Sequence, residues 1–272
     1  MNRKENKTLR NVIIFSIVAV SCGWIGRLVD LQVGTDENGS LGMLIWIMSP
    51  LLVMVVMRSW MGDGWKDFGI KPRIKENVFY YGFSILIFPI LAVMVVGISM
   101  VFGWIDVTSM SSTFLTAFFL ALIPNFIKNI FEEFSWRGYM APKLFVLGYN
   151  RFLVHIAVGV VWGAWHFPYL FMFVDTTESM ITYIPRMMIG VIAMAILYGE
   201  ILLMTRSVWP AVVMHTVGNA FINTLILDKY IHVQEEFSYV VMPSPEGILT
   251  IALTGLACLW IYKRRKRITS AR

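Results

Sequence analysis

The sequence has few charged residues and almost no cysteine. Of its 272 residues, 15% are charged and 57% are hydrophobic. This balance is typical of a chain that crosses a membrane several times and argues against a soluble globular protein. The two cysteines, Cys22 and Cys258, each lie in an apolar segment without a second thiol nearby, which argues against a disulfide framework or a thiolate metal site. No long repeat or low-complexity stretch interrupts the chain, so we expect one integral membrane domain over residues 1–272.

The chain carries a net charge of +6, but its lysines and arginines lie between apolar runs. They are not gathered with exposed aromatic residues on a soluble face. This placement argues against a nucleic-acid partner and favours contact with a lipid bilayer. The first apolar run is too long for a signal peptide and has no clear small-residue cleavage site after it, so we interpret it as a retained helix.

Eight runs reach or approach the length of about 20 apolar residues that crosses a bilayer. They cover residues 12–32, 41–57, 79–104, 114–131, 152–174, 184–204, 208–227 and 247–262. We therefore predict an all-α, polytopic membrane helical bundle of about eight transmembrane helices. Within the fifth run, Gly159 and Gly163 form a G-x-x-x-G pair, which lets a neighbouring helix approach closely.

The loops between these runs alternate in charge. Basic residues gather before the first run, over residues 58–75, over 137–151, at Arg206 and in the tail 263–267. The alternate loops are acidic, as at Asp106 and Asp228. Because basic loops stay on the cytoplasmic side, we expect both termini to be cytoplasmic and the protein to lie in the plasma membrane.

The fourth run is followed by Glu132, Glu133 and Arg137. Ionisable groups in a membrane-spanning segment are costly and are functional-site candidates by default. Successive helical residues point about 100° apart, so the two carboxylates cannot share a face, whereas Glu133 and Arg137 form a favourable i,i+4 pair. We expect Glu133 to pair with Arg137 and Glu132 to remain free for chemistry.

Three further polar residues lie within later runs. His166 belongs to the fifth, and His215 and Asn219 lie one turn apart on one face of the seventh. Taken singly, each has a structural explanation, because a buried histidine can bond a backbone carbonyl and an asparagine can join two helices. Together with Glu132 they provide what peptide hydrolysis requires. A carboxylate and an imidazole can move a proton from water to the leaving amine, and a second imidazole and a carboxamide can bind the oxyanion.

The depths of these residues pose a geometric problem. Glu132 ends a run near the cytoplasmic side, whereas His166 lies roughly 21 Å into the next run at 1.5 Å per residue. Convergence requires the fourth helix to extend inward past its nominal boundary, or the fifth to start outside its boundary or to tilt strongly.

The order E-E-x-x-x-R, aromatic-x-x-x-H and H-x-x-x-N on successive helices resembles the CAAX protease and bacteriocin-processing family of intramembrane endopeptidases, abbreviated CPBP or Abi. Trp162 stands at the aromatic position. The resemblance covers approximately residues 114–227, which it implies to be the catalytic core, while the remaining runs are similar only in hydropathy.

The resemblance also implies roles for individual residues. Glu132 and His166 would activate the water, and His215 and Asn219 would form the oxyanion hole. Glu133 and Arg137 would support them.

The same side chains leave a metal as an alternative. Glu132 or Glu133, with His166 and His215, would make a three-ligand zinc site with an open position. However, the chain lacks the H-E-x-x-H arrangement, and Asn219 suits an oxyanion hole better than a zinc shell. We expect a glutamate-dependent mechanism without metal or other cofactor, with zinc as the competing hypothesis.

These observations lead to a hydrolase that cuts a peptide bond in a membrane-tethered or lipidated peptide near the cytoplasmic face. The resemblance implies peptide maturation, trimming of lipidated C-termini, or self-immunity against bacteriocins. One alternative is a non-catalytic membrane partner that uses the same fold to regulate another protein. A second is a transporter, against which the sequence shows no internal repeat or paired broken helices.

Overall fold

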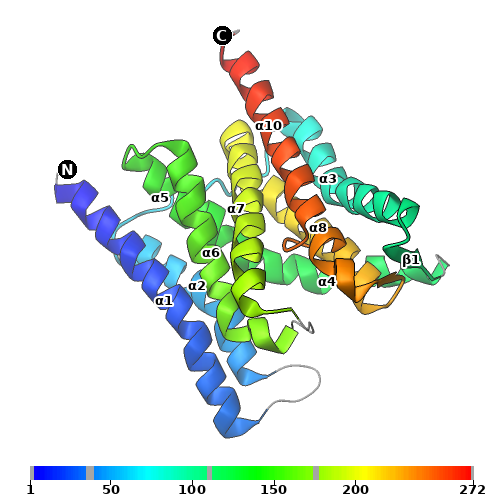
Figure 1. Cartoon of the computed structure of the whole chain (residues 1–272). Coiled ribbons are helices and arrows are strands. Elements are labelled where there is room, and N and C mark those ends of the chain that lie inside the picture. Colours follow the sequence, from blue (N-terminus) through cyan, green and yellow to red (C-terminus); the bar gives the residue numbers. More distant parts are fainter. Residues whose placement is uncertain (1–2, 35–39, 109–111, 174–177, 271–272) are drawn as a thin grey trace.

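A computed structural model of the chain describes residues 3–34, 40–108, 112–173 and 178–270, which form a helical bundle with one small sheet (Figure 1). This confirms the predicted fold class. The elements in chain order are α1 (Arg3–Val33), α2 (Leu41–Ser59), α3 (Ile74–Val101), β1 (Ile105–Val107), α4 (Ser112–Ser135), the π-helix η1 (Trp136–Met140), α5 (Ala141–Val146), α6 (Arg151–Phe173), α7 (Met180–Thr205), α8 (Trp209–Leu227), β2 (Ile231–Val233), η2 (Glu235–Phe237), α9 (Ser238–Val241) and α10 (Ile248–Ser270).

Seven helical segments in the described part of the chain are long and apolar enough to cross a membrane. They correspond to the first seven predicted runs, although the fifth run ends at Val174, which lies outside the described residues. The eighth run is helical within α10 but is not among the seven, so an eighth span stays a prediction. In Figure 1, α1 begins and α10 ends at the same end of the bundle, as an even number of crossings requires.

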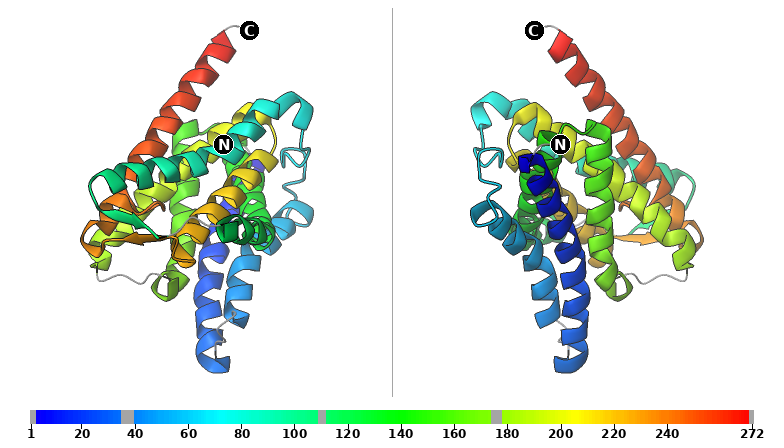
Figure 2. Two further views of the ribbon diagram at one scale, coloured as in Figure 1. Left: turned by 90° about the vertical axis from the view of Figure 1, so that its right-hand side faces the viewer. Right: turned by 90° about the vertical axis from the view of Figure 1, so that its left-hand side faces the viewer.

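The fourth helix lies across the bundle. In Figure 1, α4 runs crosswise to α6 and α7, and in the left view of Figure 2 it is seen nearly end-on. The helical path also continues past the predicted boundary at residue 131, through η1 and α5. The structure thus resolves the difference in depth through the fourth helix, which reaches into the middle of the molecule.

Close helix contacts are made where the sequence provides small residues. A Cβ added to Gly159 would lie 2.8 Å from the Cα of Ile192, and one added to Gly163 would lie 2.3 Å from Sδ of Met188. Both glycines therefore allow α6 to pack tightly against α7, which confirms the interpretation of the G-x-x-x-G pair. The paired helix α7 is capped by Ser179, whose side chain accepts a hydrogen bond from the N–H of Ile181.

One buried acid joins the first two helices to α6. Asp30, near the end of α1, accepts hydrogen bonds from the N–H of Gly42 and the hydroxyl groups of Ser40 and Tyr169, each at 2.8 Å. These donors satisfy a carboxylate that would otherwise be costly among apolar side chains. Asp30 therefore has a structural role in joining these helices.

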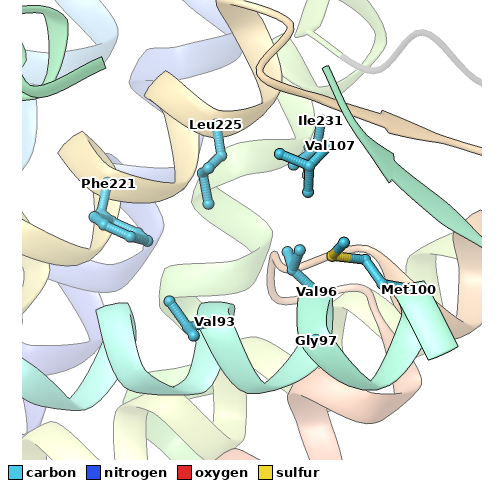
Figure 3. Close-up of a pocket in the computed structure, with 8 residues that line it drawn as sticks. All are labelled: Val93, Val96, Gly97, Met100, Val107, Phe221, Leu225 and Ile231. Carbon is cyan, nitrogen blue, oxygen red and sulfur yellow. The ribbon is translucent and has the colours of Figure 1, made fainter. Parts of the chain in front are cut away.

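The antiparallel strands β1 and β2 pair Ile105 with Val233 and Val107 with Ile231. They connect the segment after α3 to the segment after α8. Figure 3 shows part of this region, where Val107 and Ile231 face Val96 and Met100 of α3 across a small apolar pocket. This sheet was not expected from the sequence.

Candidate active site

The two glutamates lie at the end of α4, where the helix changes its winding. Glu132 and Glu133 are both buried, and the next turns form the π-helix η1. Single π-helical turns are frequent at functional sites because the extra residue per turn redirects the side chains around it. The winding thus changes between Glu133 and Arg137, the pair that sequence analysis placed one turn apart.

The end of α2 and the segment between α2 and α3 contact η1 and α5. Buried Arg58, at the end of α2, donates hydrogen bonds to the carbonyl oxygens of Gly64 and Gly138. It also forms a salt bridge of 2.8 Å with Asp67, which Lys143 of α5 contacts at the same distance. These contacts hold the turn after the glutamates against the α2–α3 loop.

Glu133 bridges two helices. Its Oε1 accepts a hydrogen bond from Arg137 at 3.1 Å, which confirms the predicted i,i+4 pair. The same oxygen lies 2.9 Å from Nδ1 of His215 on α8. The second contact was not predicted, and it makes Glu133 the direct partner of a candidate catalytic histidine.

Glu132 points to a different set of partners. Its Oε2 accepts a hydrogen bond of 2.8 Å from the indole N–H of Trp162, and its Oε1 lies 3.7 Å from Nζ of Lys128. It also interacts electrostatically with His215 and His166. An indole and an ammonium group therefore hold this carboxylate in place, and its expected role in the chemistry stays a prediction.

Trp162 lies at the centre of these groups. Its ring centroid is 5.9 Å from that of His166 and 5.4 Å from that of His215. The guanidinium of Arg137 lies over the same ring, 4.4 Å from its centroid. Trp162 thus contacts Glu132, Arg137 and both histidines, and it is the residue that brings α4, α6 and α8 together.

The partners of the two histidines define which ring nitrogen remains free. Nδ1 of His166 lies 2.9 Å from the carbonyl oxygen of Trp162. A carbonyl only accepts, so this nitrogen carries a proton and Nε2 of a neutral ring is left as an acceptor. Because Nδ1 of His215 is taken by Glu133, its Nε2 is likewise the atom left for another partner.

Asn219 lies one turn after His215 and contacts α4 in parallel with it. Its side-chain amide donates to Oδ1 of Asn129 at 3.3 Å, one turn before Glu133. The pairs Asn219–Asn129 and His215–Glu133 therefore follow each other along two packed helices. Asn129 was missed by sequence reasoning, although its position four residues before Glu133 places it on the same helical face.

A small pocket of about 70 Å³ adjoins this pair of helices. Asn219 lines it together with Tyr198 of α7, which is fully buried and whose hydroxyl has no hydrogen-bond partner among the described residues. The ring centroid of Tyr198 lies 5.6 Å from that of His215. Sequence reasoning gave no signal for Tyr198, because a tyrosine in an apolar helix has no spacing to mark it.

Comparison with known proteins shows which family the region around this site is similar to. Residues 113–221 match the family described as type II CAAX prenyl endopeptidase, Rce1-like. This stretch contains every candidate site residue. This match agrees with the resemblance to the CPBP family that the motifs indicate.

One curated relative is similar to this chain over a short stretch. The protein named CAAX prenyl protease 2 from Methanococcus maripaludis is 38% identical over 63 residues. That stretch covers 23% of this chain and spans only 21% of the relative's own length.

The candidate zinc ligands Glu133, His166 and His215 have other hydrogen-bond partners. Among the described residues, no group of three or more histidine, cysteine, aspartate or glutamate side chains is arranged to hold a metal ion. Of the candidate ligands, Glu133 is bound to Arg137 and His215, and Nδ1 of His166 is bound to a carbonyl. The side chains as they lie do not fit a zinc shell, so no step described below passes through a metal.

A second polar cluster lies outside the CPBP motifs. Buried Glu200 of α7 contacts His155 at 3.2 Å, Arg151 at 3.6 Å and Arg265 at 3.3 Å. It joins α6, α7 and α10, which gives His155 a structural role. The sequence gave no sign of these pairs, because their members lie far apart along the chain.

Proposed function

We propose that the chain is an intramembrane endopeptidase that hydrolyses a peptide bond in a membrane-tethered or lipidated peptide near the cytoplasmic face. The observation that carries this proposal is the set of contacts around Trp162, which gathers a buried carboxylate and two imidazoles from three helices. Such a set has the groups that activate water and bind an oxyanion. The buried carboxylate alone, or a buried imidazole alone, would have a structural explanation.

In the proposed reaction, Glu132 and His166 activate the water. A proton passes from water to this pair, and the oxygen attacks the carbonyl carbon of the substrate. The proton then goes to the amine as the C–N bond breaks. Each such proton transfer by a positioned side chain contributes about 10²- to 10⁴-fold to the rate. Two features support these roles: Nε2 of His166 is an acceptor in the neutral ring, and Trp162 and Lys128 orient Glu132.

His215 and Asn219 are proposed to bind the oxyanion that forms on the carbonyl oxygen. Nε2 of His215 can donate to it when the His215–Glu133 pair holds one additional proton, on either the second ring nitrogen or the carboxyl group. The Asn219 amide donates from the next turn of the same helix. Glu133 and Arg137 therefore act through His215, as positioning residues.

The side and substrate class are argued from charge and family. The basic loops, including residues 58–75 and the turn after Glu133, support a site near the cytoplasmic face, because basic loops stay on that side. The matching family and the archaeal relative are both named for CAAX prenyl protease activity. A lipid-modified peptide reaches such a site from within the bilayer. Maturation of such peptides and self-immunity are the processes that fit this chemistry.

The direct test uses the purified protein in liposomes with a lipidated reporter peptide. Wild-type protein should release the expected fragments, and Glu132→Gln, which keeps the side-chain shape but cannot accept a proton, should release none. Glu236→Gln, an exposed glutamate in the acidic loop after β2, is the matched control and should cleave normally. Equal cleavage by Glu132→Gln would reject the proposed chemistry. No cleavage of any lipidated peptide by wild type would favour the non-catalytic regulator.

A further inference from the structure

A pocket of about 650 Å³ lies beside the α2–α3 segment, away from the candidate catalytic groups. Its walls come from that segment, from α5 and from the end of α7. Figure 1 shows these parts at the end of the bundle where α1 begins. The lining residues are Trp65, Lys66, Asp67, Gly69, Ile70, Lys71, Arg73, Pro142, Phe145, Val146, Leu202, Leu203 and Arg206.

Four basic side chains line this pocket, and all four are exposed: Lys66, Lys71, Arg73 and Arg206. None of them forms a hydrogen bond or ion pair with another residue in the described part of the chain. The acid in the lining, Asp67, is held by Arg58 and Lys143. The pocket therefore presents unneutralised positive charge.

The backbone gives a second, independent observation. Arg73 and Arg206 adopt left-handed conformations, with φ of 50° and 52°. A residue with a Cβ carries a strain there that glycine would avoid, and such strain is concentrated at functional sites. Arg206 ends α7 in the position that glycine usually takes, so the arginine side chain is present despite its backbone cost.

The rest of the lining is apolar. Ile70, Phe145, Val146, Leu202 and Leu203 lie among the basic groups, and the last four belong to α5 and α7. A small soluble anion would not contact these apolar side chains favourably. A phospholipid has both parts, because its phosphate is anionic and its acyl chains are apolar.

We propose that this pocket binds an anionic phospholipid, with the phosphate among Lys66, Lys71, Arg73 and Arg206 and the upper acyl chain against Phe145 and Leu203. Basic pockets at the cytoplasmic ends of membrane helices are suited to such headgroups. The lipid would bridge the α2–α3 segment, α5 and α7. Its binding should therefore stabilise the contacts that the end of α2 and the α2–α3 segment make with η1 and α5.

The test compares lipids on the full-length protein in detergent. Phosphatidylglycerol should raise the thermal unfolding temperature, and phosphatidylcholine with the same acyl chains should not. The triple variant Lys71→Gln/Arg73→Gln/Arg206→Gln should bind phosphatidylglycerol on the order of 10²-fold more weakly by native mass spectrometry, from about fivefold per basic residue. The variant Arg3→Gln/Lys4→Gln/Lys7→Gln loses the same charge at the start of α1 and should bind normally.

Arg206→Gly keeps the test decisive if the triple variant is poorly folded. Glycine relieves the left-handed strain, so this variant should unfold at a higher temperature than wild type without lipid and gain less from phosphatidylglycerol. The proposal is overturned by unchanged lipid binding in both pocket variants, by an equal loss in the α1 variant, or by the same stabilisation with inorganic phosphate alone. Retained lipid binding with lost peptide cleavage would assign the pocket to the peptide instead, which also overturns it.

Discussion

Glu132 and Glu133 are adjacent in the sequence but belong to different parts of the site. Glu133 is bound to the guanidinium of Arg137 and to His215. Glu132 accepts a hydrogen bond from the indole of Trp162 and lies 3.7 Å from the ammonium group of Lys128. Helical geometry predicted this division, since neighbouring side chains cannot share a face. The partners on other helices could not be predicted, because nothing in one sequence gives the packing of α4 against α6 and α8.

Replacing Glu133 tests its positioning role. Glu133→Gln should lower both the turnover number and the stability, because the amide weakens the contact with Arg137. Leaving a buried polar group without its partner costs about 1–3 kcal/mol in the free energy of unfolding. Thermal unfolding in detergent and peptide turnover measure the two effects. A stable and inactive Glu133→Gln, beside a fully active Glu132→Gln, would exchange the roles assigned to the two glutamates.

Replacing Asn219 tests the oxyanion hole. Asn219→Ala should reduce turnover by about 10²- to 10³-fold, the usual loss for one oxyanion donor. The Michaelis constant should change little, since the hydrogen bond forms in the transition state. Asn125→Ala is the control, because that amide donates to the carbonyl oxygen of Ala121 in its own helix. Equal losses in the two variants would show a structural effect of the amide rather than a catalytic one.

At the scale of elements, hydropathy predicted the seven spanning helices, because a helix of about 20 apolar residues matches the thickness of the hydrocarbon core. It could not predict that α4 lies across the bundle, since hydropathy gives the length of a segment and not its tilt. The π-helix η1 was equally hidden. It depends on Arg58, which lies 80 residues before Gly138 in the sequence and binds its carbonyl oxygen.

The salt bridges of Asp67 with Arg58 and Lys143 should contribute less to the stability of the protein in acid. Burial would raise the pKa of Asp67, but hydrogen bonds from Lys143 and Arg58 outweigh it and hold the pKa below the ordinary value of 3.8. A lowered pKa contributes stability above the unfolded value, and this contribution is lost as the pH falls through the folded value. Asp67→Asn should therefore be less stable than wild type at neutral pH, and the difference should shrink below about pH 4.

Chemical unfolding at a series of pH values measures this difference. An Asp67→Asn variant as stable as wild type at pH 7, or a difference in stability that grows in acid, would show that the salt bridges of Asp67 do not stabilise the fold. Lys75→Met changes an exposed residue of α3 that forms no recorded ion pair within the described part of the chain and is the control.

At the scale of the whole molecule, the sequence located the site because its motifs fall within one contiguous region, residues 113–221. The alternation of loop charge anticipated that α1 begins and α10 ends at one end of the bundle. The pocket formed by Arg73, Arg206 and α5 could not be predicted, since its walls come from three separate segments. Basic residues there were visible in the sequence only as a sign of topology.

Metal dependence is a property of the whole protein, and it separates the two proposed mechanisms. The purified protein should contain less than one equivalent of metal and keep most of its activity after prolonged chelation. In the zinc alternative, His166 and His215 would be ligands and Asn219 would matter less. One equivalent of tightly bound zinc, lost together with activity and restored with it, would contradict the metal-free account.

The central claim is that Glu132 cuts membrane peptides, and comparative peptidomics of membranes tests it most directly. Cells producing wild type, Glu132→Gln or the exposed control Glu236→Gln at equal levels are compared for processed and intact peptides. The account predicts a set of membrane-associated peptides that is processed with wild type and with Glu236→Gln and stays intact with Glu132→Gln. The same processed set in cells that hold only stable Glu132→Gln would contradict it.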